Sequence, residues 1–261
     1  TRLLDPTRHS TIANAGGTEL IKGLDVVGFN YIVQNDVDNR KRNNPTWKIV
    51  GTEETTGCGT RGVYFDGEDK SRMVSINYHP TPNAQHPTPP NVIERGWQFY
   101  ADRPWAAGLF YWTGFDYRGE PNPLSYPAHD SEFGILDYCG FWKDEAWYLK
   151  AWWTDDPVLH IFPHWNLQGH EGEEVELWAY SNCDEVELMV NGKKLGRQPM
   201  PKNGHLKWKA VYQPGRVVAT GYKNGKRILT QTIETTKPAY KLVLKADRQT
   251  LTADGSDVAV V

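Results

Sequence analysis

The spacing of apolar and polar positions changes near residue 156. Before it, short apolar runs end in polar residues and alternate with segments that have apolar side chains at helical spacing. These patterns predict strands at residues 23–31, 47–53 and 106–112, and helices at residues 91–100 and 143–153. Strands that alternate with helices are typical of βα units on a parallel sheet.

After residue 156, short strands with alternating apolar side chains follow one another directly. We predict them at residues 174–180, 185–190, 206–212 and 216–222. Asn191-Gly192 and Asn224-Gly225 are sequences that favour tight hairpin turns. Residues 157–236 are therefore predicted to form an immunoglobulin-like β-sandwich.

Two further segments complete the expected organisation. The proline-rich residues 66–90 are expected to be largely a surface loop. Residues 237–261 are expected to hold a linker and the start of a further β-domain, because a strand pattern begins there and the sequence stops inside it. The fold class expected is thus α/β plus all-β.

Composition excludes several classes of partner. The 261 residues have a formal net charge of −3, which gives no electrostatic reason to expect DNA, RNA or an anionic membrane surface. The mean hydropathy is −0.63 and no apolar run is long enough to predict a transmembrane helix. Three scattered cysteines predict neither a disulfide framework nor a paired-cysteine zinc site, and they leave the redox compartment open.

Tryptophan is the residue type in clear excess. Eight of the eleven tryptophans fall between residues 97 and 165. An indole face suits the apolar face of a sugar ring, so the cluster indicates a carbohydrate ligand. Most of these side chains are nevertheless expected in the core, where large aromatics usually lie.

Two motifs fail on inspection. Residues 57–62 fit the glycine pattern of a dinucleotide site, but no amphipathic helix follows to direct its N-terminus at a pyrophosphate. His160 and His164 have the spacing of metal ligands on a helix, but Pro163 would break that helix. With His170 they are expected to be ordinary surface or interface histidines, and we predict no metal site.

The ends of three predicted strands carry a better candidate site. Asn30-Tyr31, Thr52-Glu53 and Trp112–Asp116 would meet at the carboxyl edge of a parallel sheet, where active sites of βα barrels lie. A carboxylate there fits the nucleophile of a retaining glycosidase. Glu53 and Glu54 point to opposite faces of a strand, so at most one is catalytic. The alternative for Glu53 is a structural ion pair with Arg61.

These runs carry a family resemblance. The segments GTE…TRG at residues 51–62, YWTGFDYRGEP at 111–121, VLHIFPHWN at 158–166 and YSNCDEVEL at 180–188 resemble glycoside hydrolase family 2, the β-galactosidase group. The resemblance implies that residues 1–156 are the C-terminal half of a (β/α)8 TIM barrel. It also implies a retaining, exo-acting β-glycosidase that acts on terminal β-linked sugars, with β-galactosidase favoured.

Residue roles follow from the same resemblance. Glu53 matches the family's nucleophile by its position in the GTE motif, and this position selects Glu53 rather than Glu54. Tyr31 matches the tyrosine that hydrogen-bonds the nucleophile, a contact that favours the ionised carboxylate. Trp112 matches the tryptophan that lines the sugar subsite. Asp116 and Asn30 are expected to bind sugar hydroxyls.

The resemblance also implies what this sequence lacks. Family members carry a general acid/base glutamate after an asparagine at the fourth barrel strand, and we expect it upstream of Thr1, in an N-terminal half that completes the barrel. No organic cofactor is expected. Some relatives use Mg or Na ions, but this sequence shows no cluster of residues that would predict a metal site.

Several properties stay open at this stage. The resemblance favours a periplasmic or extracellular protein, and a homo-oligomer is left open. The alternatives are a β-glucuronidase of the same family, which would need basic or amide groups facing a sugar carboxylate, and a non-catalytic carbohydrate-binding protein that uses the tryptophan cluster.

Overall fold

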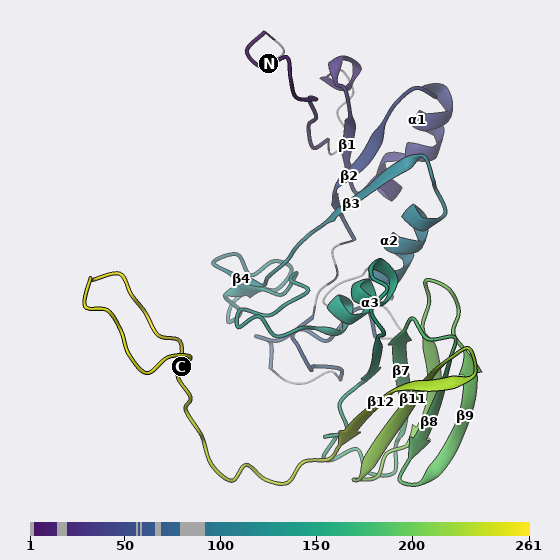
Figure 1. Cartoon of the computed structure of the whole chain (residues 1–261), viewed down its shortest axis with the longest axis vertical. Helices are drawn as coiled ribbons and strands as arrows, with labels where there is room; N and C mark the ends of the chain where they lie inside the picture. The colour runs from purple at the N-terminus through teal and green to yellow at the C-terminus, as the bar shows by residue number, and fades with distance from the viewer. Residues whose placement is uncertain (1–2, 15–19, 56, 58, 66–68, 79–91) are drawn as a thin grey trace.

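A computed structural model describes residues 3–14, 20–55, 57, 59–65, 69–78 and 92–261. Figure 1 shows a first part with a small parallel sheet and helices, a β-sandwich beside it, and a C-terminal segment that runs away from both. Within the described residues, no helix is long and apolar enough to cross a membrane.

The parallel sheet of the first part has the strand order β1-β2-β3. Its strands are β1 (Val27–Asn30), β2 (Ile49–Glu54) and β3 (Ala106–Tyr111). The helices of this part are α1 (Val37–Asn43), α2 (Val92–Ala101) and α3 (Asp144–Trp153), with 3-10 turns η1 (Leu20–Gly23) and η2 (Ile32–Asn35). A two-stranded ribbon pairs β4 (Tyr117–Arg118) with β5 (Asp130–Ser131). The predicted strands and helices are thus present, with α1 and the ribbon in addition.

The parallel pairing confirms the βα reading, but half of a barrel is not evident. The described part of the sheet contains three parallel strands, and its outer strands β1 and β3 each pair only with β2. Helices α1 and α2 lie along one side of this sheet (Figure 1), where Phe29, Ile49 and Tyr100 form a common core. Three strands give an open sheet with unpaired edges rather than a curved half barrel.

The sandwich consists of two antiparallel sheets. One has the order β10-β7-β6 and the other β12-β11-β8-β9. The strands are β6 (Leu159–Phe162), β7 (Glu174–Ser181), β8 (Glu185–Val190), β9 (Lys193–Pro199), β10 (Leu206–Val211), β11 (Arg216–Lys223) and β12 (Lys226–Glu234). Alternating side chains of both sheets, such as Leu177 and Val186, fill one core around Trp165. The predicted sandwich is present, and it has three strands more than the pattern predicted.

Both predicted hairpin turns are present. Asn191 and Gly192 have φ values of 47° and 83°, and Asn224 and Gly225 have 51° and 73°. Left-handed backbone at both central positions is the type I′ geometry that matches the twist of paired strands. These turns join β8 to β9 and β11 to β12, so they fix the register of the four-stranded sheet.

The three-stranded sheet of the sandwich is apolar on its outer face as well. Trp178 and Tyr180 of β7 point away from the sandwich core and pack with Tyr148 and Leu149 of α3. Phe162 of β6 belongs to the same cluster, 4.8 Å from the Tyr180 ring. Helix α3 therefore connects the first part to the sandwich through a continuous apolar contact.

The expected surface loop is in part buried. Residues 79–91, with all five prolines of the segment and Asn91, lie outside the described residues. Residues 73–78 form no helix or strand, yet all six are buried, and Met73 and Ile76 pack with Phe133. The prediction was wrong for residues 73–78, because proline content indicates an irregular backbone but does not indicate whether the residues are buried.

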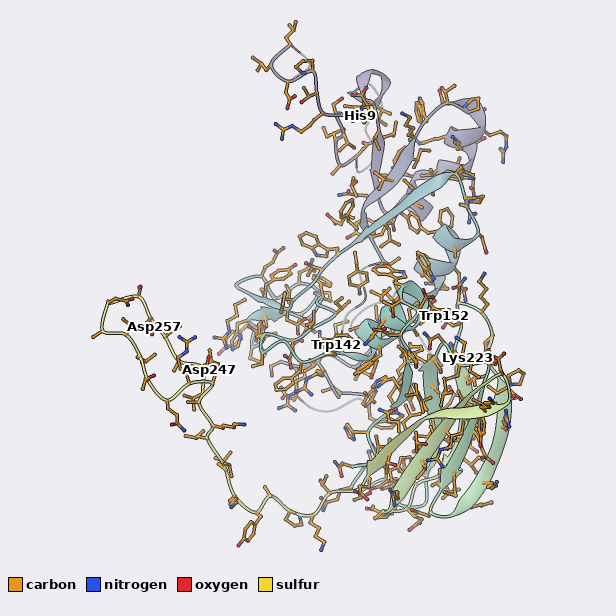
Figure 2. All side chains as sticks on the ribbon, viewed as in Figure 1. His9, Trp142, Trp152, Lys223, Asp247 and Asp257 are labelled. Atoms are coloured by element: carbon orange, nitrogen blue, oxygen red, sulfur yellow. The ribbon has the colours of Figure 1, made fainter. Side chains whose placement is uncertain are left out.

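Residues 237–261 contain no strand. Tyr240, Leu242 and Leu244 alternate as in a strand, but their side chains are exposed, and among the described residues no segment pairs with them. The segment turns back on itself, and the Asp247 N–H donates to the carbonyl oxygen of Val260 at 3.0 Å. Figure 2 places Asp247 and Asp257 on this turn, away from the sandwich. The assignment to a further β-domain remains a prediction.

Candidate active site

The carboxyl ends of β1, β2 and β3 bring the predicted residues together. In the parallel register Asn30 lies opposite Glu53, and Glu54 lies opposite Tyr111. Tyr31 and Trp112 directly follow β1 and β3, so they lie at the same edge of the sheet. The sequence predicted this juxtaposition because the ends of adjacent parallel strands meet at one edge.

Glu53 is held through both carboxylate oxygens. The Tyr31 hydroxyl donates to its Oε1 at 2.7 Å, and the Asn30 side-chain amide donates to its Oε2 at 3.2 Å. The Thr52 hydroxyl donates to the Asn30 Oδ1 at 2.8 Å, which turns the amide nitrogen of Asn30 towards Glu53. Both carboxylate oxygens of this half-buried side chain are therefore held by donors at the end of β1.

Glu54 lies on the other face of the strand. Its side chain is buried and accepts hydrogen bonds from the backbone N–H of Ile32 and from the Tyr100 hydroxyl, the latter at 2.8 Å. Burial raises the pKa of Glu54. The alternation of strand side chains thus gives the two neighbouring glutamates separate environments.

Trp112 is available for stacking. Its side chain is 39% exposed, and its ring contacts Tyr117 edge to face at 6.3 Å. Its backbone N–H donates to the carbonyl oxygen of Glu54 at 3.1 Å, which ties the residue to the end of β2. The exposed Trp112 indole and the half-buried Glu53 carboxylate thus lie at the same edge of the sheet.

Asp116 is not placed to bind a sugar hydroxyl. Its side chain is 2% exposed and its Oδ1 forms an ion pair with the Lys143 Nζ at 2.7 Å. The same oxygen accepts from the Gly134 N–H at 2.9 Å. The expected ligand role is therefore replaced by a structural one, because the hydrogen-bonding capacity of this buried carboxylate serves the chain itself.

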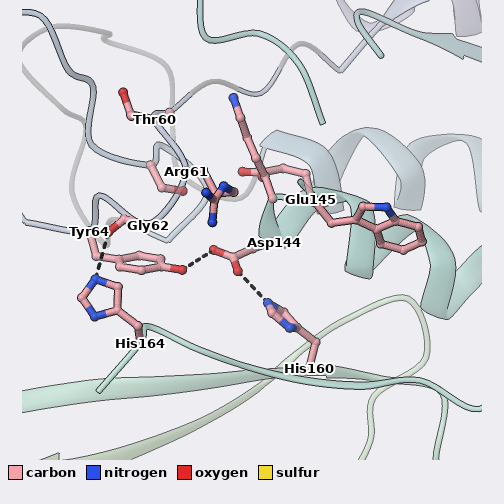
Figure 3. Close-up of a pocket in the computed structure, with 12 residues that line it drawn as sticks. Thr60, Arg61, Gly62, Tyr64, Asp144, Glu145, His160 and His164 are labelled. Atoms are coloured by element: carbon pink, nitrogen blue, oxygen red, sulfur yellow. Dashed lines mark hydrogen bonds and ion pairs between the residues drawn. The ribbon is translucent and has the colours of Figure 1, made fainter. Parts of the chain in front are cut away.

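The alternative for Glu53, an ion pair with Arg61, is not formed. The Arg61 Nε contacts the Asp137 Oδ2 at 2.6 Å instead. Arg61 also lines a cavity of about 200 Å³ that lies between the 59–64 segment, α3 and the sandwich (Figure 3). This cavity does not include Glu53 among its lining residues.

The histidines at this cavity make structural contacts. The His160 Nε2 lies 2.6 Å from the Asp144 Oδ1, while the Tyr64 hydroxyl donates to the Asp144 Oδ2 at 2.9 Å. The His164 Nε2 lies 3.0 Å from the carbonyl oxygen of Gly62 (Figure 3). In the part of the chain that the structure describes, no group of three or more His, Cys, Asp or Glu side chains is arranged to hold a metal ion.

Sequence reasoning missed two residues that shape the site. Lys143 was read only as the start of a helix, yet it is the buried partner of Asp116. Asn35 donates from its side chain to the carbonyl oxygens of Asn30 at 2.7 Å and Tyr31 at 3.2 Å. Neither residue has a sequence signal of its own, because neither belongs to a motif and each acts only through the residues that it contacts.

Comparison with known proteins places this site in a class. A family model described as a domain of unknown function, DUF4982, matches residues 172–229, within the sandwich. Beta-galactosidase BoGH2A of Bacteroides ovatus is 37% identical over 99% of this chain, which covers 32% of that protein. A beta-glucuronidase of Formosa agariphila is 38% identical over 49% of this chain and 13% of that protein.

A solved structure supports the same class. The crystal structure of a glycosyl hydrolase family 2 member from Bacteroides cellulosilyticus superposes with a TM-score of 0.75 at 27% identity, over 99% of this chain and 34% of that one. The class that the fold and the site define is thus that of the glycoside hydrolases. The chain belongs to glycoside hydrolase family 2, and it spans about a third of the length of these full-coverage relatives.

Proposed function

We propose that this chain carries the nucleophile side of the active site of a retaining β-glycosidase. The observation that carries the proposal is the 2.7 Å hydrogen bond from the Tyr31 hydroxyl to Glu53 at the carboxyl edge of the parallel sheet. In this function the Glu53 carboxylate attacks the anomeric carbon and forms a glycosyl-enzyme, which water then hydrolyses.

Each neighbour has a part in this reaction. Tyr31 and Asn30 orient the carboxylate before the attack, and Trp112 stacks on the sugar ring. A second carboxyl group, about 5 Å from the Glu53 carboxylate, must protonate the leaving oxygen. Glu54 and Asp116 are unsuited to this task because both are buried with partners of their own. We propose that the acid/base glutamate lies in the part of the family's length that this chain does not span.

The same proposal includes a barrel fold for the first part of the chain. Strands β1, β2 and β3 with helices α1 and α2 would be βα units of the C-terminal half of a (β/α)8 barrel, with further parallel strands along the edges of β1 and β3. The unpaired edges of this sheet support that assignment, since exposed parallel edges are unfavourable.

The substrate proposed is a terminal β-linked galactoside. The beta-galactosidase relative is 37% identical over 99% of the chain, whereas a putative beta-glucuronidase of Formosa agariphila is 29% identical over 94% of it, so identity favours the galactosidase. A glucuronide would need a cationic or amide group for its carboxylate. The Asn30 side-chain amide is oriented towards Glu53 by its contacts with Glu53 and Thr52, which favours a role at the nucleophile over a role at a sugar carboxylate.

Hydrolysis assays on the full-length gene product test the function. Chromogenic β-galactoside and β-glucuronide are compared for the unchanged protein and for Glu53→Gln. We expect preferential hydrolysis of the galactoside, and a loss of several orders of magnitude in Glu53→Gln, because the amide keeps its shape and is not a nucleophile. Preferential hydrolysis of the glucuronide would contradict the substrate, and sugar binding without turnover would contradict the enzyme.

A further inference from the structure

Tyr31 reaches Glu53 from an uncommon backbone conformation. Its φ and ψ are 58° and 73°, in the left-handed region that residues other than glycine rarely adopt. Such a conformation persists only where surrounding contacts hold it. The position of the Tyr31 hydroxyl therefore depends on what holds the Tyr31 backbone.

Three hydrogen bonds hold this backbone. The Tyr31 N–H donates to the carbonyl oxygen of Glu53 at 2.8 Å. The next peptide unit is held at both ends, since the Asn35 side-chain amide donates to the Tyr31 carbonyl oxygen at 3.2 Å and the Ile32 N–H donates to the Glu54 carboxylate. The bond to Glu54 restrains the ψ angle of Tyr31, because ψ sets the direction of the following N–H.

Glu54 is itself fixed by helix α2. The Tyr100 hydroxyl donates to the Glu54 Oε1 at 2.8 Å, the same oxygen that accepts from Ile32. Gly51 leaves room for this contact, because a Cβ at that position would lie 1.9 Å from the Tyr100 hydroxyl oxygen. A continuous set of contacts thus runs from α2 through Glu54 to the turn that carries Tyr31.

We infer that Glu54 is a positioning residue for the reaction at Glu53, and that it acts by holding the Tyr31–Ile32 peptide so that the Tyr31 hydroxyl meets the nucleophile. The inference rests on the proposed function. Glu54 is 3% exposed and faces the helix side, so it contacts no substrate. Its removal would leave the buried Ile32 N–H without an acceptor and would release the backbone of Tyr31.

A double-mutant cycle in the full-length gene product tests the inference. The values of kcat/KM for an aryl β-galactoside are compared for Glu54→Leu, Tyr31→Phe and the double variant. Each single variant is expected to lose about tenfold to about 10²-fold, since misplacement of a catalytic contact by about 1 Å costs that much. The double variant should lose no more than Tyr31→Phe alone, because both changes remove one contact.

Two matched variants separate positioning from stability. Glu54→Gln keeps an oxygen acceptor for Ile32 and Tyr100, so it should retain most of kcat/KM. Val27→Ala removes buried volume from β1 without touching Tyr31, so it should lower the melting temperature and leave kcat/KM unchanged. Multiplicative losses in the cycle, or equal losses in Glu54→Gln and Glu54→Leu, would overturn the inference.

A structural readout distinguishes this inference from the proposed function. In a crystal structure of the Glu54→Leu full-length protein, the Tyr31 hydroxyl should have left hydrogen-bond distance of Glu53. A Tyr31 that stays in place overturns the inference whatever the activity. An active Glu53→Gln variant, in contrast, overturns the proposed function.

Discussion

Two consecutive glutamates at the end of β2 have side chains in different surroundings. Glu53 is half-buried between polar donors, whereas Glu54 is buried against Ile32 and Tyr100. The direction of a strand side chain alone separates them. At the scale of the residue, the face of the sheet that a carboxylate occupies therefore sets its hydrogen-bond partners and its exposure.

Trp112 allows a direct test at this scale. Trp112→Ala in the full-length gene product should weaken transition-state binding of an aryl β-galactoside by about 1–2 kcal/mol, because it removes a stacking surface. The melting temperature should change little, since the side chain is 39% exposed and a buried tryptophan would cost about 3–5 kcal/mol of stability. Steady-state kinetics and thermal melts measure the two effects.

Trp153 provides the matched control. It is 44% exposed and lies on α3, where its ring contacts Trp97 at 5.6 Å. Trp153→Ala should leave kcat/KM unchanged. A Trp112→Ala variant that loses stability but keeps its kinetics would assign Trp112 to the core instead of the sugar subsite.

Helix α3 makes the stability of the molecule depend on pH. Glu145 in its first turn is buried and accepts from the Asn77 side-chain amide at 2.6 Å. Burial, and then the neighbouring Asp144 carboxylate, raise the pKa of Glu145 to about 7 from its ordinary 4.5. Between these pH values the folded protein retains a proton that the unfolded chain has released, so the free energy of unfolding falls as pH rises.

Glu145→Gln should remove this dependence. The amide keeps an acceptor for Asn77 and carries no charge, so the variant should gain stability relative to the unchanged protein as pH rises from 5 to 8. Chemical denaturation at several pH values measures the difference. Glu234→Gln, at an exposed position on β12, is the control and should show a constant difference. A constant difference for Glu145→Gln would contradict the assignment.

Elements with a local signal were predictable from sequence. The Asn-Gly turns confirm this, because left-handed backbone at Asn191 and Gly192 is a local preference of these residue types. The meeting of Asn30, Tyr31 and Glu53 was predictable for a related reason, since parallel strand ends share one edge. The burial of residues 73–78 and the Asp116–Lys143 pair were not, because both depend on partners distant in sequence.

On the scale of the whole molecule, the sandwich has a core of its own and a second apolar face that α3 covers. Leu177 faces the sandwich core, and its neighbour Trp178 belongs to the aromatic cluster on the outer face, which also includes Tyr148 and Leu149 of α3. A sheet that is apolar on both faces needs a cover on each side. The sandwich is therefore expected to fold alone while exposing an aromatic patch, which consists of Phe162, Trp178 and Tyr180.

Two lengths of chain test this expectation. Residues 157–236 expressed alone should unfold in a single cooperative transition, and residues 144–236, which include α3, should melt several degrees higher. Circular dichroism follows both. Tyr180→Ser should destabilise the longer chain more than the shorter one, because the longer chain adds the contact between the Tyr180 ring and Tyr148 of α3. An unfolded short chain, or equal melting temperatures, would contradict the account.

The central claim is that Glu53 is the nucleophile, and covalent trapping tests it most directly. The full-length gene product is incubated with an activated 2-fluoro β-galactoside, which forms a glycosyl-enzyme that hydrolyses slowly, and the labelled peptide is sequenced by mass spectrometry. The account predicts one sugar per chain on Glu53, and no label in Glu53→Gln. A label on Glu54 or Asp116, or turnover without any glycosyl-enzyme, would contradict it.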